Sequence, residues 1–126
     1  MRPEVKEEWV EALRSGEYEQ TKGFLHRLEA NDDIPVGYCC LGVLCDLAVK
    51  AGVVENDPDG VVEYFGNEQA VLPRAVEIWA GLDQEGKLPT PIVMGDNEAK
   101  AMSLVSLNDS YNYTFEQIAD VVEEQF

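Results

Sequence analysis

The residues best suited to chemistry in this sequence are three cysteines, Cys39, Cys40 and Cys45. Thiolates act as nucleophiles and as metal ligands. On a helix, Cys40 and Cys45 would point about 140° apart and Cys39 and Cys45 about 120° apart, so the three cannot converge on one metal ion. The spacing also matches no zinc-binding pattern. We therefore predict no metal site and three small side chains buried in a core helix.

His26 is the only histidine, and it leaves one enzymatic alternative, a nucleophilic pair with Cys39 or Cys40. Nothing in the neighbouring sequence supports that pair. The chain also has no glycine-rich phosphate loop and no nucleophile elbow of the hydrolase type. We therefore expect no catalytic residue, no cofactor and no enzymatic activity.

A second group of candidate residues lies between positions 14 and 38. Four of the chain's ten basic side chains, histidine included, fall within 14 residues, and aromatic and amide side chains lie near them. Such a group could bind a phosphate-bearing small molecule through ion pairs and aromatic stacking. The alternative is that these cations balance the acids of a neighbouring helix. The candidate ligand-binding residues are Arg14, Tyr18, Gln20, Lys22, His26, Arg27 and Tyr38.

A third group lies in the second half of the chain, where Asn108 and Asp109 stand beside Tyr111. These are the most ligand-like polar residues of that half, and loops carry sites more often than cores do. We include them among the ligand-binding candidates. A turn that these residues cap is the alternative.

The last predicted helix has a clear start, because Thr114 and Gln117 form a capping box. Its solvent side carries acids at four-residue steps, and like charges at that spacing destabilise a helix. Acids near its end also oppose the helix dipole. We expect this face to be uncompensated and to suit a basic partner. The acidic face consists of Glu116, Asp120, Glu123 and Glu124.

Three further helices are predicted from apolar periodicity. The first spans Pro3 to Ser15. The second, 38–51, is the most apolar stretch, with Asp46 and Lys50 as its only charges, and we expect it to be the buried central helix. The third spans Leu72 to Ala80 and ends at a glycine.

The rest of the chain predicts loops, a little β-structure and one more helix. A small hairpin is expected within 53–65, around the turn at 56–60. Residues 83–90 are expected to form a loop, and 91–94 a short edge strand. Asp96 is suited to cap a helix that runs to about Leu107. Together these elements predict one helix-dominated α+β domain over residues 1–126.

Charge and length narrow the possible partners. The chain has 126 residues, with 25 acidic and 9 basic side chains and a formal net charge of −16. This charge argues against direct binding of duplex nucleic acid or of an anionic membrane surface. No apolar run approaches a membrane span, no signal-peptide pattern is visible, and the cysteines form no disulfide framework. We therefore expect a cytoplasmic protein.

Several motifs together resemble a known family. Gly-Glu-Tyr-Glu-Gln, Tyr-Cys-Cys-Leu-Gly-Val-Leu-Cys-Asp-Leu-Ala, Leu-Pro-x5-Trp-x-Gly-Leu, Leu-Asn-Asp and Thr-Phe-Glu-Gln-Ile-Ala-Asp occur in this order. The series resembles a family of small bacteriophage and prophage accessory proteins and covers nearly the whole chain. The linker at 110–113 is richer in aromatic residues than in that family. The resemblance implies a setting, the cytoplasm of an infected bacterial host, and no mechanism.

Two functions fit these observations. The first is a non-enzymatic inhibitor of host antiviral defence, which binds a basic surface of a host protein and in its sharpest form mimics nucleic acid. The alternative is a homo-oligomeric sponge that sequesters a small phosphate-bearing signalling molecule.

Overall fold

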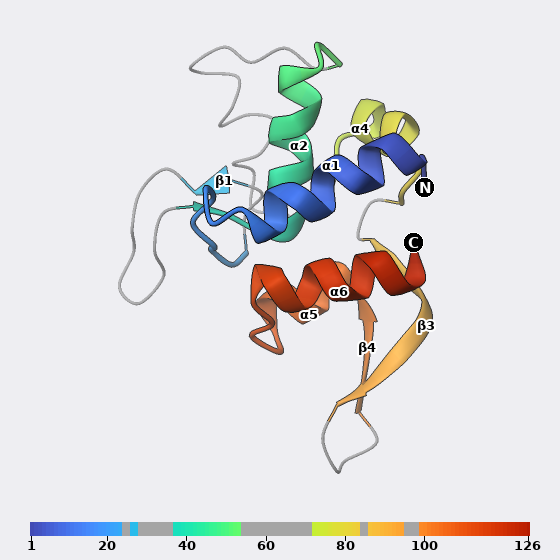
Figure 1. Cartoon of the computed structure of the whole chain (residues 1–126). Coiled ribbons are helices and arrows are strands. Elements are labelled where there is room, and N and C mark those ends of the chain that lie inside the picture. The colour runs from blue at the N-terminus through green and yellow to red at the C-terminus, as the bar shows by residue number, and fades with distance from the viewer. Residues whose placement is uncertain (24–25, 28–36, 54–71, 84–85, 95–98) are drawn as a thin grey trace.

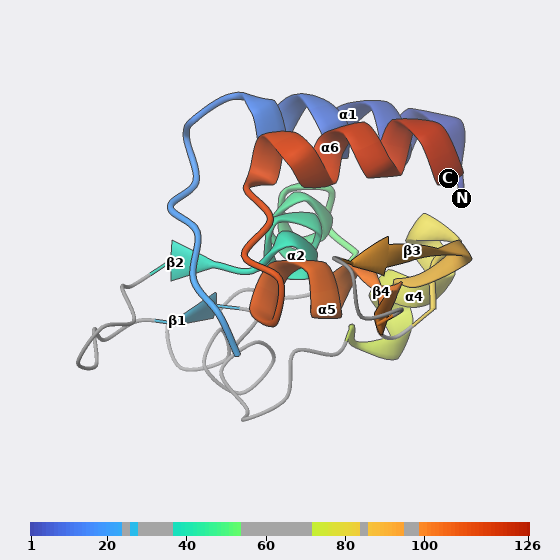
Figure 2. The ribbon, with the colours of Figure 1, turned by 90° about the horizontal axis from the view of Figure 1, so that it is seen from below.

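The two ends of the chain form helices that lie side by side as one outer layer, as Figures 1 and 2 show. The computed structural model describes residues 1–23, 26–27, 37–53, 72–83, 86–94 and 99–126. In Figure 2, helices α1 (Pro3–Arg14) and α6 (Phe115–Gln125) lie over most of the remaining elements. Both chain termini lie at the same end of this layer.

Helix α1 agrees with the first predicted helix to within one residue. Proline at its start suits a first-turn position, where no amide donor is needed. Its apolar side chains recur at helical spacing on one buried face. That face consists of Val5, Trp9, Val10 and Leu13.

Helix α6 confirms the predicted capping box. The Thr114 hydroxyl accepts a hydrogen bond from the Gln117 amide at 3.2 Å, and the Thr114 amide donates to Gln117 Oε1 at 2.9 Å. Two of the first-turn donors are thereby satisfied. The buried side of the helix carries Phe115, Ile118, Ala119, Val121 and Val122.

Helix α2 (Cys40–Lys50) is the predicted central helix, and nearly all of its first two turns is buried. It begins two residues later than expected, because Cys39 is its N-cap and Tyr38 belongs to a strand. The Trp9 indole donates a hydrogen bond of 2.9 Å to the Cys40 carbonyl. This buried bond ties the outer layer to the first turn of α2.

Helix α4 (Arg74–Ala80) confirms the third predicted helix, except that Pro73 is its N-cap and not a first-turn residue. The helix ends at Gly81, whose φ of 71° lies in the left-handed region. A side chain there would also meet the backbone of Met1 at 3.3 Å. The start of the chain is thus held against the end of α4, where the Arg2 amide donates to the Ala80 carbonyl at 3.0 Å.

The helix predicted from Asp96 to about Leu107 is wrong. Residues Ala99–Ser103 form strand β4, antiparallel to β3 (Lys87–Met94), and only Leu104–Asp109 is helical, as α5. The Ala-Lys-Ala-Met composition favours a helix, but Ala101 and Ser103 alternate with exposed neighbours as a half-buried strand does. The true cap is Ser103, whose hydroxyl accepts from the Ser106 amide.

The loop predicted for residues 83–90 is also too long, because β3 begins at Lys87 and includes the edge strand predicted at 91–94. The register of β3 against β4 shifts between Lys87 and Ile92. Pro89 and Pro91 lie in that interval and cannot donate to a ladder, which accounts for the irregularity.

A second small sheet joins β1 (His26–Arg27) to β2 (Gly37–Tyr38) in antiparallel register. Gln20 forms a parallel bridge with Tyr38 on the other side of β2. Gly37 is required here, because a Cβ would lie 2.3 Å from the Glu19 carbonyl oxygen. The hairpin predicted within 53–65 lies almost wholly outside the described residues.

The described elements confirm the α+β, helix-dominated fold class. They comprise five helices and two two-stranded antiparallel sheets, and their buried side chains form a shared hydrophobic cluster. Among the helices in the described ranges, none has the length and apolar composition to cross a bilayer.

Candidate functional site

The outer surface of the α1/α6 layer is strongly acidic. The two helices together carry eight exposed acids and only two cations, Lys6 and Arg14, so the layer has a net charge of −6. We call this surface the acidic face. Its acids are Glu4, Glu7, Glu8, Glu11, Glu116, Asp120, Glu123 and Glu124.

The acids of α1 form a stripe that lies outside the predicted site residues. Glu4, Glu7, Glu8 and Glu11 follow one another at steps of three, one and three residues, so they share one side of the helix. Each like-charge pair at such spacing costs a few tenths of a kcal/mol. The stripe could have been predicted from the sequence, because these acids recur at helical spacing on the side opposite Val5 and Trp9.

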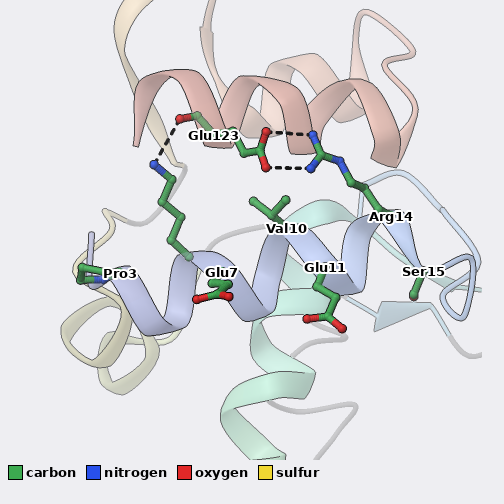
Figure 3. A pocket seen from close by; sticks show the side chains of 8 residues that line it. Pro3, Glu7, Val10, Glu11, Arg14, Ser15 and Glu123 are labelled. Atoms are coloured by element: carbon green, nitrogen blue, oxygen red, sulfur yellow. Dashed lines mark hydrogen bonds and ion pairs between the residues drawn. The ribbon is translucent and has the colours of Figure 1, made fainter.

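Arg14 bridges the two helices and corrects the expectation that the acids of the last helix are uncompensated. Its guanidinium donates to Asp120 at 2.6 Å. It also donates to the two carboxylate oxygens of Glu123 at 2.7 and 3.1 Å (Figure 3). The last helix is therefore not uncompensated at Asp120 and Glu123. Arg14 is also committed to α6, as in the alternative that the cations of its group balance neighbouring acids.

The same contacts shift the protonation equilibria of the bridge. Hydrogen bonding to Glu123, and then to Asp120, raises the pKa of Arg14, and the bond from Arg14 lowers the pKa of Glu123. The three side chains are 36% to 69% exposed, so water and salt screen the bridge. The bridge therefore contributes little to stability.

An open groove of about 910 Å³ runs along the outside of this bridge. The Lys6 ammonium group donates to the backbone carbonyl of Glu123 at 3.1 Å. Arg14, two helical turns further along α1, reaches the Glu123 carboxylate (Figure 3). Val10 lies between them, and Glu7 and Glu11 extend from α1. Pro3 and Ser15 complete the lining.

Three of the predicted ligand residues come together as an internal network. Asn108 is fully buried, its amide donates to the Thr21 carbonyl at 2.9 Å and to Asp109 Oδ1 at 2.8 Å, and its Oδ1 accepts from Gln20 at 2.7 Å. Gln20 also donates to the Tyr113 carbonyl at 2.7 Å. These bonds join residues 20–21 to α5, so Asn108 has a structural role here, and ligand binding by this group stays a prediction.

Two other candidates, Tyr18 and Tyr38, meet edge to face with ring centroids 5.1 Å apart. The Tyr18 hydroxyl donates to Asp46 and accepts from Lys50 at 3.2 Å. Burial, and then the bond to Asp46, raises the pKa of Tyr18 to about 12. Asp46 and Lys50 lie four residues apart on one side of α2 as an ion pair, and the Tyr18 hydroxyl bonds to both.

The remaining candidates do not complete a cationic pocket within the described residues. Lys22 is half-buried, and Tyr111 is half-buried against the core. The backbones of His26 and Arg27 pair with Tyr38 and Gly37, while their side chains lie outside the described part of the structure. The side-chain hydrogen bonds of Arg14 go to Asp120 and Glu123 of α6.

The three cysteines are buried, as predicted. Their exposed fractions are 1% or less. Burial raises the pKa of Cys39 to about 12 and also raises the pKa values of Cys40 and Cys45. A thiol in this setting is held protonated and is a poor nucleophile at neutral pH. In the described ranges no three His, Cys, Asp or Glu residues are grouped to hold a metal ion.

Comparison with known proteins identifies the family of this chain. The family described as Domain of unknown function (DUF8296) matches residues 1–126, so the chain belongs to it. No curated protein and no solved structure matches the chain.

The Asn108 network generates a first prediction. Asn108→Ala removes the buried hydrogen bonds of Asn108 to the Thr21 carbonyl and to Gln20, so the free energy of unfolding should fall by roughly 2 to 4 kcal/mol. Gln20→Ala should cost less, because Gln20 is only half-buried. The double variant should lose less than the sum of the two, as measured by urea denaturation. Strict additivity would show that the two residues act separately.

Cysteine burial generates a second prediction. Iodoacetamide should leave all three thiols of the native protein unmodified over a time in which the urea-unfolded chain reacts completely, as followed by intact mass. Raising the pH from about 7 to about 9 should accelerate only the unfolded chain, since an ordinary thiol has a pKa near 8.5. Rapid labelling of native Cys39 or Cys40 would instead favour the nucleophile paired with His26.

Proposed function

For this member of the DUF8296 family, we propose a non-enzymatic binding function in which the acidic face of α1 and α6 docks onto a basic surface of a partner protein. One observation carries the proposal. Eight exposed acids lie on two packed helices, and both cations of these helices already contact α6.

The energetics of the free protein favour this proposal over a purely structural role for the acids. Like charges at positions 4, 7, 8 and 11 and at 116, 120 and 124 repel one another along each helix. A basic surface would reverse the sign of that interaction and would also speed the encounter of the two proteins. The arrangement is thus unfavourable alone and favourable in a complex.

The biological setting of the proposal comes from the resemblance to phage and prophage proteins. In that setting the partner is a host protein in the cytoplasm of an infected bacterium, and binding inhibits an antiviral defence. The acidic face would occupy a groove that normally holds nucleic acid, as a mimic of the phosphate backbone. A net charge of −16 opposes direct binding of nucleic acid or of an anionic membrane by this chain.

A second candidate function, the oligomeric sponge for a phosphate-bearing messenger, is supported by one local arrangement. Gln20 and His26 flank Tyr38 on opposite sides of strand β2. The backbones of Gln20, Tyr38 and His26, three of the candidate ligand-binding residues, therefore lie next to one another. The loss of Arg14 to α6 weakens this candidate, because it removes one of the four basic side chains.

The proposal predicts a partner complex that depends on the acidic face. Purified wild type, added to bacterial extract, should capture a host protein in a complex that dissociates as salt is raised. Glu8→Gln/Glu124→Gln should weaken its affinity for that purified protein about tenfold, since each exposed ion pair contributes up to about 1 kcal/mol. Titration calorimetry measures the change.

The matched control is Glu17→Gln/Glu19→Gln, which removes the same charge from exposed positions outside the two helices. Equal weakening by both double variants, or a complex insensitive to salt, would contradict the proposal. Native mass spectrometry of the same samples tests the sponge, which requires a homo-oligomer that releases a phosphate-containing molecule.

A further inference from the structure

The outward face of α4 carries the most exposed large apolar side chain in the described part of the chain. Ile78 is 69% exposed and lies beside an open hollow of about 310 Å³. Residues at helical spacing line this hollow, namely Arg74, Glu77, Ile78, Gly81 and Leu82. Figure 1 shows α4 at the edge of the molecule, next to the start of α1. Covering Ile78 would remove apolar surface from water and would therefore favour association.

Two opposite charges flank Ile78 on this face. Arg74 is exposed and Glu77 is half-buried, and among the described residues neither forms an ion pair within 4.0 Å. The two charges cancel, so the hollow is neutral in a chain whose net charge is −16. Two copies of the chain therefore repel each other less at this face than at the acidic face.

The order of these residues along α4 makes the face complementary to itself. Two α4 helices can pack antiparallel about a two-fold axis at the level of position 76. Because each residue rises about 1.5 Å along a helix, Arg74 of each copy then lies within about 1.5 Å, along the helix axes, of Glu77 of the other. The same packing lays Ile78 of each copy against the aliphatic stem of Arg74 of the other. Ala75, which is small and exposed, allows the two helices to approach closely.

We propose that this face of α4 binds a second copy of the chain, so that Ile78 is covered and Arg74 and Glu77 form two reciprocal ion pairs across the two-fold axis. A two-fold contact closes on itself, so it yields a dimer and not a filament. A basic partner would instead meet the like charge of Arg74 here, so the complementary charges select the second copy. A contact centred on two seven-residue helices is smaller than a standard interface, so the dimer is weak, with a Kd on the order of 100 μM.

Analytical ultracentrifugation of the full chain tests the proposal. The measurement runs from roughly 10 μM to roughly 1 mM protein in about 150 mM NaCl, where the Debye length is about 8 Å and the overall repulsion is screened. The average mass should rise from that of one chain toward that of two. Ile78→Asp should raise the Kd about tenfold or more, because it would bury an unpaired carboxylate in the contact. Its circular dichroism spectrum should match that of the wild type, since Ile78 is exposed in the single chain.

Charge exchange distinguishes this contact from a non-specific association. Arg74→Glu and Glu77→Arg should each weaken the dimer about tenfold, since each single variant loses both ion pairs and sets like charges against each other. The double variant Arg74→Glu/Glu77→Arg should restore the wild-type Kd to within about threefold, and an equimolar mixture of the two single variants should also associate. A change in the stability of the fold would produce neither rescue.

The matched control is Val93→Asp, which places the same charge at another exposed apolar position, on strand β3. It should leave the dimer unchanged. A chain that stays monomeric at about 1 mM, a dimer that survives Ile78→Asp, or a double variant that associates no better than the single ones would overturn the α4 interface. Failure of the proposed function is seen separately, in a host complex that ignores salt and the Glu8 and Glu124 substitutions.

Discussion

Helices from the two ends of the chain pack against each other although both are negatively charged, and the rest of the structure depends on that contact. α1 carries four acids and two cations, and α6 carries four acids and no cation. The repulsion between these charges is opposed by the burial of apolar side chains on both helices, which include Val5, Leu13, Ile118 and Val122. Burying one such side chain contributes about 1.5 to 3 kcal/mol, whereas each like-charge pair costs a few tenths. Burial therefore outweighs the repulsion by a wide margin, and the acids can remain on the outside.

This layer also determines what the interior can do. The Trp9 indole reaches the Cys40 carbonyl, so α2 begins under the cover of α1. The cysteines that dominate a first inspection of the sequence are then enclosed, with raised pKa values. The thiols are therefore poorly placed to react at neutral pH. The most distinctive surface of the described structure is the acidic face of α1 and α6.

The fold was predictable from sequence where the signals are local. The capping box at Thr114 and the apolar run around Cys40–Ala48 need only neighbouring residues, and both predictions are confirmed. Strand β4 was missed because Ala and Met favour a helix locally, and only pairing with β3 decides against it.

The candidate site was less predictable from the sequence than the fold. Arg14 meets Asp120 across 106 positions and Gln20 meets Asn108 across 88, and no spacing rule reports such contacts. The ion pairs of Arg14 with Asp120 and Glu123 are therefore seen only in the folded structure.

The central claim is that the acidic face is a source of repulsion in the free protein, retained for a partner. The most direct test is the thermal unfolding midpoint of the isolated chain as NaCl is raised from roughly 10 mM to roughly 150 mM, which shortens the Debye length from about 30 Å to about 8 Å. The account predicts that the midpoint rises, because screening relieves the like-charge stripes more than it weakens the exposed Arg14 bridge. A midpoint that falls over this range would mean that attractive ion pairs dominate, and it would contradict the claim.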